Sequence, residues 1–488
     1  MHEQQDGPRR PGRAKAAVVS ALAGMLVALF AATDVTSAAT FEVTKRGDPP
    51  AGPCTPADCS LREAVIAAND NLVGGDTISL PSSATYNLSI PISMAEPQSG
   101  DLDVSNDSVA VVHQGEGRAT IDANGLDRVF DVGAGAPLTL RHIAVTGGDP
   151  FGSSAYGGGI RSLARLVLVN SLVNGNVAGG CGGGIHVQDG AALVLRHTRV
   201  ANNRSAGNAG GISASCLGNA GPVTIEDSTI SGNRSDLDAT GNGYGGGIYL
   251  QTTGGVQSAI ERTTFTGNSS GPGGTGGSDG GGIYTDLGRL RVTASTIDAN
   301  RAGDGGGGIY VDGTSPFTMS NSTVWANRAN DNGGGIALVG GDASLNAVTV
   351  ARNRGNADGD LSEAGGGLYD GTGLFAVKNS LIALNTLTAL TPGDPPVKND
   401  CSSVDPFQSR GHNLLSTRFL CQGFDQPGDF ARADPKIGAL SANGGPTETV
   451  PLGPNSPAIS RADPDTAPVQ DQRGHKRDAR PDIGAFER

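Results

Sequence analysis

The chain has 488 residues, of which 77 are glycine and only 4% are aromatic, and its formal net charge is −13. Glycine costs ~1 kcal/mol per helical position relative to alanine, so a helix bundle is excluded, and glycine does not recur every third residue as in collagen. The excess of carboxylates is a poor match for nucleic acid or anionic lipid, because proteins bind both through basic patches. A β architecture with many turns is left.

The first 39 residues have the order of a secretory signal peptide. Residues 16–32 are uncharged and mostly apolar, they follow four basic residues, and the small residues 37–39 come after them. A run of this length is at the short end for a membrane span, so we expect cleavage and export rather than an uncleaved anchor.

Residues 60–69 (SLREAVIAAN) predict one short amphipathic helix. Ser60 and Glu63 have the spacing of a capping box. The apolar face would consist of Leu61, Ala64, Val65 and Ala68. We predict that this helix belongs to an N-terminal cap over residues 40–75, which covers the open end of the architecture that follows.

A Gly-Gly-Ile or Gly-Gly-Leu phrase recurs every 25–36 residues along the centre of the chain. The phrases end at Ile160, Ile185, Ile212, Ile248, Ile283, Ile309, Ile336 and Leu368. Each is followed by a run with alternating apolar positions that ends in asparagine, which is typical of short strands with one buried face. Three such strands per repeat predict a right-handed, single-stranded parallel β-helix of about eleven coils over 76–387, rather than a leucine-rich repeat or a propeller.

The repeated asparagines predict a structural column rather than catalytic residues. They are Asn176, Asn203, Asn233, Asn268, Asn300, Asn327, Asn353 and Asn385. Asparagine tolerates a left-handed bend, and its amide can both donate to and accept from the asparagine one coil away. We expect the glycine phrases to supply positive φ and close backbone approach before each strand.

The last hundred residues, 388–488, are rich in proline and glycine and predict a loop-rich extension that continues or covers the final coils. The six cysteines favour disulfides in an exported chain, whereas their spacings do not suggest a zinc site. Proximity suggests the pairs Cys54–Cys59, Cys181–Cys216 and Cys401–Cys421, although six cysteines allow fifteen pairings.

Both ends of the chain contain short sequence motifs of a known protein family. Residues 59–64 spell CSLREA, and 119–132 look like the first coils of the same proteins. The words DPKIG, NGGPT, SPAI, DQRG and DIGAFE follow in order from residue 434 to 487. The chain therefore resembles bacterial exported CSLREA-domain proteins with a choice-of-anchor Q domain. The resemblance implies an extracellular or surface protein and transfers no catalytic residue. In that family a sorting tail usually follows the DIGAFE phrase; none is seen after it here, so we expect release or attachment through a partner.

Two groups of side chains are candidates for binding. Tyr249, Tyr284 and Tyr310 follow the repeated isoleucines on successive coils and are expected to point outward, where aromatic faces suit sugars or protein partners. A cross-strand stack that stabilises the sheet is the interpretation that we favour, and a binding face is the alternative. The loop carboxylates are solvated or bind calcium weakly; they are Asp236, Asp238, Asp279, Asp304, Asp331, Asp358, Asp360 and Glu363.

These observations predict an exported, non-enzymatic protein that binds an extracellular polysaccharide or a surface protein through a flat solenoid face, as an adhesin does. The alternative is a polysaccharide lyase or glycoside hydrolase on the same scaffold. A groove with two or more carboxylates and a basic residue between them would distinguish the enzyme. No catalytic residue, metal site or cofactor is predicted apart from the weak calcium site, and the oligomeric state stays open.

Overall fold

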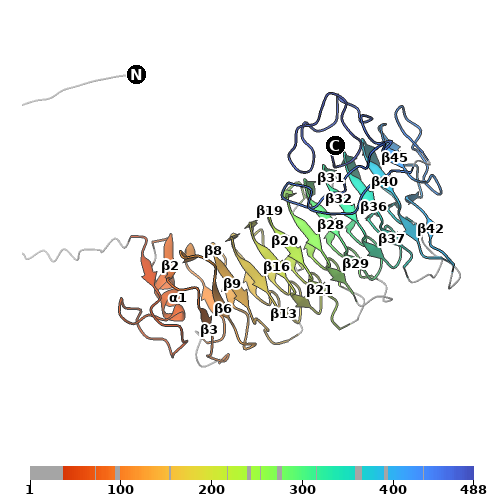
Figure 1. The fold of residues 1–488 in the computed structure, drawn as a ribbon. Helices are drawn as coiled ribbons and strands as arrows, with labels where there is room; N and C mark the ends of the chain where they lie inside the picture. Colours follow the sequence, from red (N-terminus) through yellow and green to blue (C-terminus); the bar gives the residue numbers. More distant parts are fainter. Residues whose placement is uncertain are drawn as a thin grey trace, which may run out of the picture. The chain divides into compact units, whose positions relative to one another are not determined.

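The computed structural model describes residues 37–71, 73–93, 99–152, 155–216, 218–238, 243–252, 254–271, 277–314, 316–357, 365–389, 394–431 and 434–488. These residues fold as the predicted right-handed parallel β-helix, and among them one short helix lies at its N-terminal end (Figure 1). Most of the predicted signal peptide lies outside the described residues. No helix in the described part of the chain is long and apolar enough to span a membrane.

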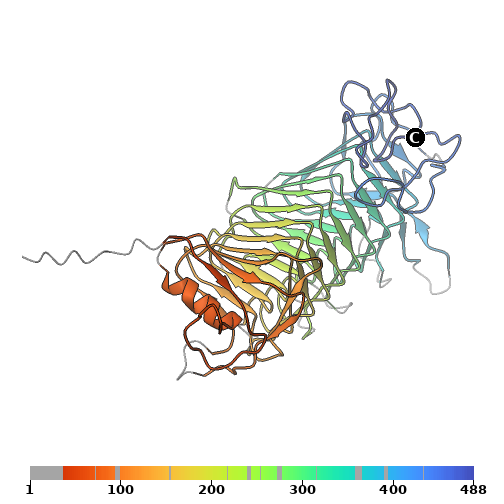
Figure 2. The same cartoon turned by 60° about the vertical axis from the view of Figure 1, so that its left-hand side comes forward.

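Four parallel sheets run along the solenoid (Figure 2), and each is named here by its first strand. The β1 sheet has 13 strands: β1 (Thr40–Glu42), β2 (Asp76–Leu80), β5 (Val109–His113), β8 (Leu138–Arg141), β11 (Leu166–Val169), β15 (Leu193–Arg196), β19 (Val223–Glu226), β23 (Gln257–Glu261), β27 (Arg289–Thr293), β31 (Phe317–Ser320), β35 (Asp342–Asn346), β39 (Leu374–Lys378) and β44 (Gln408–Ser409).

The β4 sheet has 11 strands and contains the Gly-Gly-Ile phrases. They are β4 (Leu102–Val104), β7 (Phe130–Val132), β10 (Ile160–Ser162), β14 (Ile185–Val187), β18 (Ile212–Ala214), β22 (Ile248–Leu250), β26 (Ile283–Thr285), β30 (Ile309–Val311), β34 (Ile336–Leu338), β38 (Leu368–Asp370) and β43 (Cys401–Ser403). The repeated isoleucines pair with one another in register and are fully buried, so they form one apolar column inside the solenoid.

The β3 sheet has 12 strands: β3 (Thr85–Asn87), β6 (Ala119–Asp122), β9 (Ile143–Thr146), β12 (Leu172–Asn174), β16 (Arg199–Ala201), β20 (Thr229–Ser231), β24 (Thr264–Thr266), β28 (Thr296–Asp298), β32 (Thr323–Trp325), β36 (Thr349–Ala351), β40 (Leu381–Ala383) and β45 (Leu414–Leu415).

The prediction of three strands per coil is incomplete, because a fourth, two-residue strand follows the ladder asparagine. These strands form the β13 sheet: β13 (Val177–Ala178), β17 (Arg204–Ser205), β21 (Arg234–Ser235), β25 (Ser269–Ser270), β29 (Arg301–Ala302), β33 (Arg328–Ala329), β37 (Arg354–Gly355), β41 (Thr386–Leu387) and the antiparallel β42 (Val397–Lys398). Two residues between the asparagine bend and the next turn are too few to show an alternating sequence pattern, yet their backbone pairs with the next coil.

The asparagines form a continuous buried ladder, but the left-handed backbone expected of them is wrong. The side-chain amide of Asn300, for example, donates to Asn327 Oδ1 at 2.9 Å, and the same bond recurs from Asn176 onward to Asn385, which donates to Asp400. Positive φ belongs instead to the preceding residue, as at Ala299 (53°) and Leu384 (60°). The preceding residue makes the bend, so the asparagine side chain can turn inward toward the next coil.

The CSLREA motif, residues 59–64, forms the start of helix α1 (Leu61–Asp70) at the N-terminal end of the solenoid. The helix begins at Ser60, which forms the predicted capping box with Glu63, and the predicted apolar face is buried. Cys59 forms a disulfide with Cys54. Buried Arg62 binds both carboxylate oxygens of Asp48 at 2.8 and 3.0 Å and also donates to the Gly100 and Asp101 carbonyls. The helix is therefore fastened to the first coils by charge as well as by apolar packing.

The C-terminal extension both continues and covers the solenoid. Strands β43 to β45 extend three sheets, and Cys401–Cys421 closes this coil. Residues 434–488 then return along the β3 sheet, as the dark-blue loops in Figure 1 show. Buried Gln472 donates to Thr296 Oγ1 at 2.8 Å and accepts from Thr323 Oγ1 at 2.6 Å. The third disulfide, Cys181–Cys216, also pairs as proximity suggested.

Candidate binding site on the β4 sheet

The middle residue of each β4-sheet strand points away from the core, and these residues pair in register along the solenoid. The column begins with Asp103, Asp131, Arg161, His186, Ser213, Tyr249, Tyr284 and Tyr310. We call it the outer column. It runs from acidic through basic and polar to aromatic side chains.

From His186 to Tyr284 the outer column is buried, because the glycine turns fold over it. The residue three positions before each repeated isoleucine or leucine has positive φ, as at Gly182 (72°) and Gly280 (67°). A Cβ added to Gly182 would lie 3.0 Å from His186 Cβ, and one added to Gly280 would lie 2.8 Å from Tyr284 Cβ. Each turn therefore lies directly against the column, and the exposed fraction of His186 is 0%.

The three tyrosines predicted to bind a ligand form a stack. Tyr284 lies between Tyr249 and Tyr310, with ring centroids 5.2 and 5.4 Å apart and interplanar angles of 15° and 8°. Tyr244, from the preceding loop, packs on Tyr284 at 4.8 Å. The Tyr284 hydroxyl donates to Asp312 at 2.9 Å. Both faces of Tyr284 are covered by neighbouring rings, which is the geometry of the stabilising stack; a binding role for these tyrosines stays a prediction.

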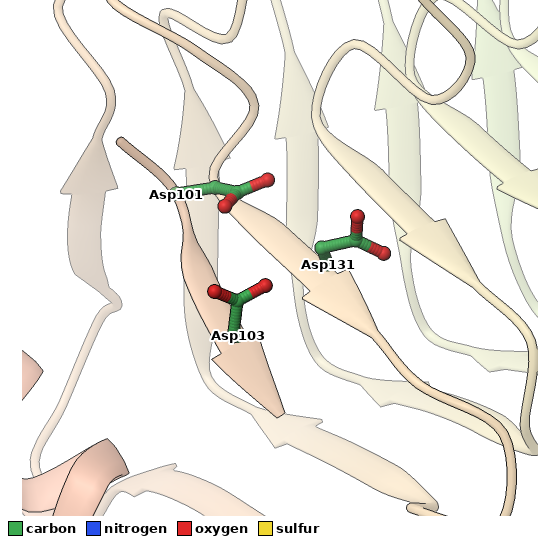
Figure 3. A group of neighbouring side chains, drawn as sticks. All are labelled: Asp101, Asp103 and Asp131. Carbon is green, nitrogen blue, oxygen red and sulfur yellow. The ribbon is translucent and has the colours of Figure 1, made fainter. Parts of the chain in front are cut away.

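The outer column is open at its N-terminal end, where a pocket of about 480 Å³ lies between α1 and strands β4, β7 and β10. Asp101, Asp103 and Asp131 lie there on neighbouring segments of the chain (Figure 3). One carboxylate oxygen of each lies within 4.8 Å of the others. Helix α1 holds strand β4 in place, because Asn69 donates to the Asp103 carbonyl at 2.7 Å and accepts from the Ser105 amide at 3.0 Å.

Arginines neutralise two of the three carboxylates. Arg128 Nη1 lies 2.8 Å from Asp101 and 3.0 Å from Asp131, and Arg161 Nη1 lies 2.9 Å from Asp131. In the described part of the chain, Asp103 has no cation within ion-pair distance and is exposed to solvent. Asp103 is therefore the carboxylate that is most available to a ligand.

Desolvation raises the pKa values of two of these carboxyl groups. Burial, followed by the charge of Asp127, raises the pKa of Asp101 to about 7, even though Arg128 acts in the opposite direction. Asp103 is exposed at the mouth of the pocket, but the surrounding protein still removes part of its hydration. This desolvation, followed by the charge of Asp131, also raises the pKa of Asp103. Near pH 7 Asp101 is thus divided between a carboxylate paired with Arg128 and a neutral carboxyl group that can donate a hydrogen bond, beside carboxylates that accept one. That combination suits hydroxyl-rich ligands and is also the basis of acid–base chemistry.

The loop carboxylates are expected to be solvated or to bind calcium weakly, and the first expectation is wrong for Asp236 and Asp279, which are buried under neighbouring loops. Asp279 is buried and accepts from the Gly305 amide at 2.8 Å, and Asp236 is buried and accepts from Ser278 Oγ at 3.2 Å. Asp358, Asp360 and Glu363 lie outside the described residues. Calcium prefers six to eight oxygen ligands, and arginines already occupy two of the three aspartates in the pocket, so weak calcium binding stays a prediction.

Sequence reasoning missed Asp101, Asp103 and Asp131. A signal was present, because LDV (102–104) and FDV (130–132) place an aspartate between two apolar residues at the outward position of a strand. Neither LDV nor FDV follows a Gly-Gly-Ile phrase, so the repeat pattern does not mark these two segments as strands of the β4 sheet.

Comparison with known proteins identifies the scaffold. A family model described as a right-handed β-helix region matches residues 105–354, more than half of the chain. No curated protein matches. Among solved structures, the crystal structure of pectate lyase Pel9A is similar, with 14% sequence identity over 93% of this chain and 98% of that chain and a TM-score of 0.44.

Proposed function

Because the chain belongs to the right-handed β-helix family, whose scaffold by itself names no activity, we propose its function from the pocket. We propose that the protein binds an extracellular glycan, without cleaving it, in the pocket between α1 and the β4 sheet. The observation that carries this proposal is the convergence of Asp101, Asp103 and Asp131 in the open part of the outer column. Pockets with a few convergent polar groups are the usual form of small-ligand sites.

The charges of the pocket favour a neutral glycan over a polyuronate. Four aspartates line it, against Arg62 and Arg161. Arg62 is paired with Asp48 and Arg161 with Asp131, so neither guanidinium is free to bind a carboxylate of a ligand. A uronate would meet like charge at Asp103, whereas sugar hydroxyls can donate to it.

The proposal is tested by measuring the affinity of neutral and acidic polysaccharides for the full exported chain. We expect D103N to weaken binding of the preferred neutral polysaccharide at least tenfold, because a neutral amide oxygen is a weaker acceptor than a carboxylate. D342N makes the same charge change at an exposed position of β35 and should bind like the unmodified protein. Equal affinity for both variants, or binding of none of the polysaccharides, would overturn the proposal.

A specific observation also favours the second candidate, a polysaccharide lyase or glycoside hydrolase. The pocket combines carboxylates with arginine between them, and the pKa of Asp101 is raised to about 7, which suits a general acid. Release of unsaturated or reducing sugars from the same polysaccharides, lost in D101N, would replace binding by catalysis as the function.

We also propose that the protein acts outside the cell. The three disulfides support an oxidising compartment. The apolar run at 16–32 supports cleavage of a signal peptide within 1–39. We propose that 40–75 is a CSLREA-type cap, 76–387 the repeats and 388–488 a choice-of-anchor Q-like domain. Mass determination of the protein recovered from the culture medium tests the cleavage.

A further inference from the structure

Two buried polar atoms on neighbouring strands have no hydrogen-bond partner among the described residues. They are His186 Nδ1 on β14 and Ser213 Oγ on β18. The two residues are direct register partners in the outer column, and the exposed fraction of each is 0%. Unpaired buried polar groups are rare in native proteins, and each requires a specific partner.

The hydrogen-bond network determines the state of His186. Gln188 Nε2 donates to the Asp189 carboxylate at 3.2 Å, which turns Gln188 Oε1 toward His186 Nε2 at 2.7 Å. Because an amide oxygen only accepts, Nε2 carries the proton. Burial lowers the pKa of His186 to about 4, so the ring is neutral and Nδ1 is an acceptor that needs a donor.

The surroundings close this position off from solvent. The ring of Tyr156 stacks on His186 with centroids 5.2 Å apart, and the Gly182 turn lies against the His186 side chain. The disulfide Cys181–Cys216 joins the segment before β14 to the segment after β18, which are the two strands that carry His186 and Ser213. The disulfide therefore links the chain segments that flank these two strands.

We propose that a single water molecule is bound between His186 and Ser213. The water donates one hydrogen to Nδ1 and accepts the hydroxyl hydrogen of Ser213, so both buried atoms are satisfied. A cation fits poorly, because both side chains are neutral and the cysteine sulfurs are already joined in a disulfide. The next groups in the column are Arg161 and Tyr249, and the Arg161 guanidinium is engaged by Asp131. This site is separate from the proposed glycan pocket and does not depend on that function.

The direct test is a crystal structure of the full exported chain at a resolution that shows ordered water. We expect one density peak within hydrogen-bond distance, ~2.7–3.2 Å, of both Nδ1 and Oγ. A direct contact between these two atoms, or no density between them, would overturn the proposal.

A double-mutant cycle tests the same site in solution. H186F keeps a ring to stack on Tyr156 but removes Nδ1. We expect S213A to lower the melting temperature of the unmodified protein by a few degrees and to have almost no effect in the H186F background, because the water has then already lost one of its two partners. S205A is the control, since buried Ser205 bonds within the protein to the Gly207 carbonyl, and it should have the same effect in both backgrounds. An equal effect of S213A in both backgrounds would contradict the shared water.

Discussion

Replacing one asparagine in the middle of the ladder should remove a large part of the stability of the protein. In N300A four hydrogen bonds are lost: the Asn300 amide donates to the Phe265 carbonyl and to Asn327 Oδ1, both at 2.9 Å. Its oxygen accepts from the Asn268 backbone at 3.0 Å and from the Asn268 side chain at 2.9 Å.

The four losses differ in size. Asn327 Oδ1 keeps the Asn300 backbone donor, and the Asn268 side chain keeps the Ile230 carbonyl, so each of these losses costs about 0.5–1 kcal/mol. The Asn268 backbone N–H loses the acceptor that the ladder provides, which costs about 1–3 kcal/mol. The Phe265 carbonyl loses one donor, which costs about 0.5–1 kcal/mol. The four losses sum to about 2.5–6 kcal/mol, against typical total stabilities of about 5–15 kcal/mol.

Urea unfolding followed by circular dichroism measures this change as a shift of the midpoint at constant slope. The control is N174A, which removes a single exposed amide–amide bond of 3.0 Å to Asn202 and should cost less than about 1 kcal/mol. If N300A costs no more than N174A, the ladder does not stabilise the solenoid in the way described here.

Backbone strain, burial and chain connectivity give three further predictions. A299G should raise the free energy of unfolding by ~1 kcal/mol, because Ala299 has a φ of 53°, whereas the same change at Ala302 in strand β29 should lower it; thermal unfolding of both variants distinguishes them. Burial and the charge of Asp304 raise the pKa of Asp279 to about 8. Its contribution to stability is therefore full below about pH 4 and is lost between about pH 4 and 8, so D279N should match the unmodified protein at pH 4 and melt at a higher temperature at pH 8. Replacing both cysteines of the 181–216 disulfide, which closes a 35-residue separation, should cost about 4 kcal/mol, against about 2 kcal/mol for the 54–59 bridge with its separation of 5; the reverse order in denaturant unfolding would refute the chain-entropy argument.

The repeated part of the molecule could be predicted from the amino-acid sequence alone. Register between coils follows from the repeat, since every Gly-Gly-Ile phrase places its isoleucine above the previous one. The same logic predicted the asparagine ladder, the glycine turns and the capping box of α1, because each depends on neighbours at a fixed separation along the chain. Cysteine proximity predicted all three disulfides.

Access to a ligand, in contrast, depends on the tertiary structure. Tyr284 points outward as its strand position predicts, yet the Gly280 turn and two neighbouring rings cover it. Asp103 becomes part of a pocket because helix α1 packs beside strand β4, and α1 is not part of the repeat. The return of residues 434–488 along the β3 sheet depends in the same way on Gln472 reaching Thr296 across 176 positions of sequence. Periodicity encodes the contacts between equivalent positions on successive coils, whereas turns, cap and return segment cover those coils through contacts that do not repeat.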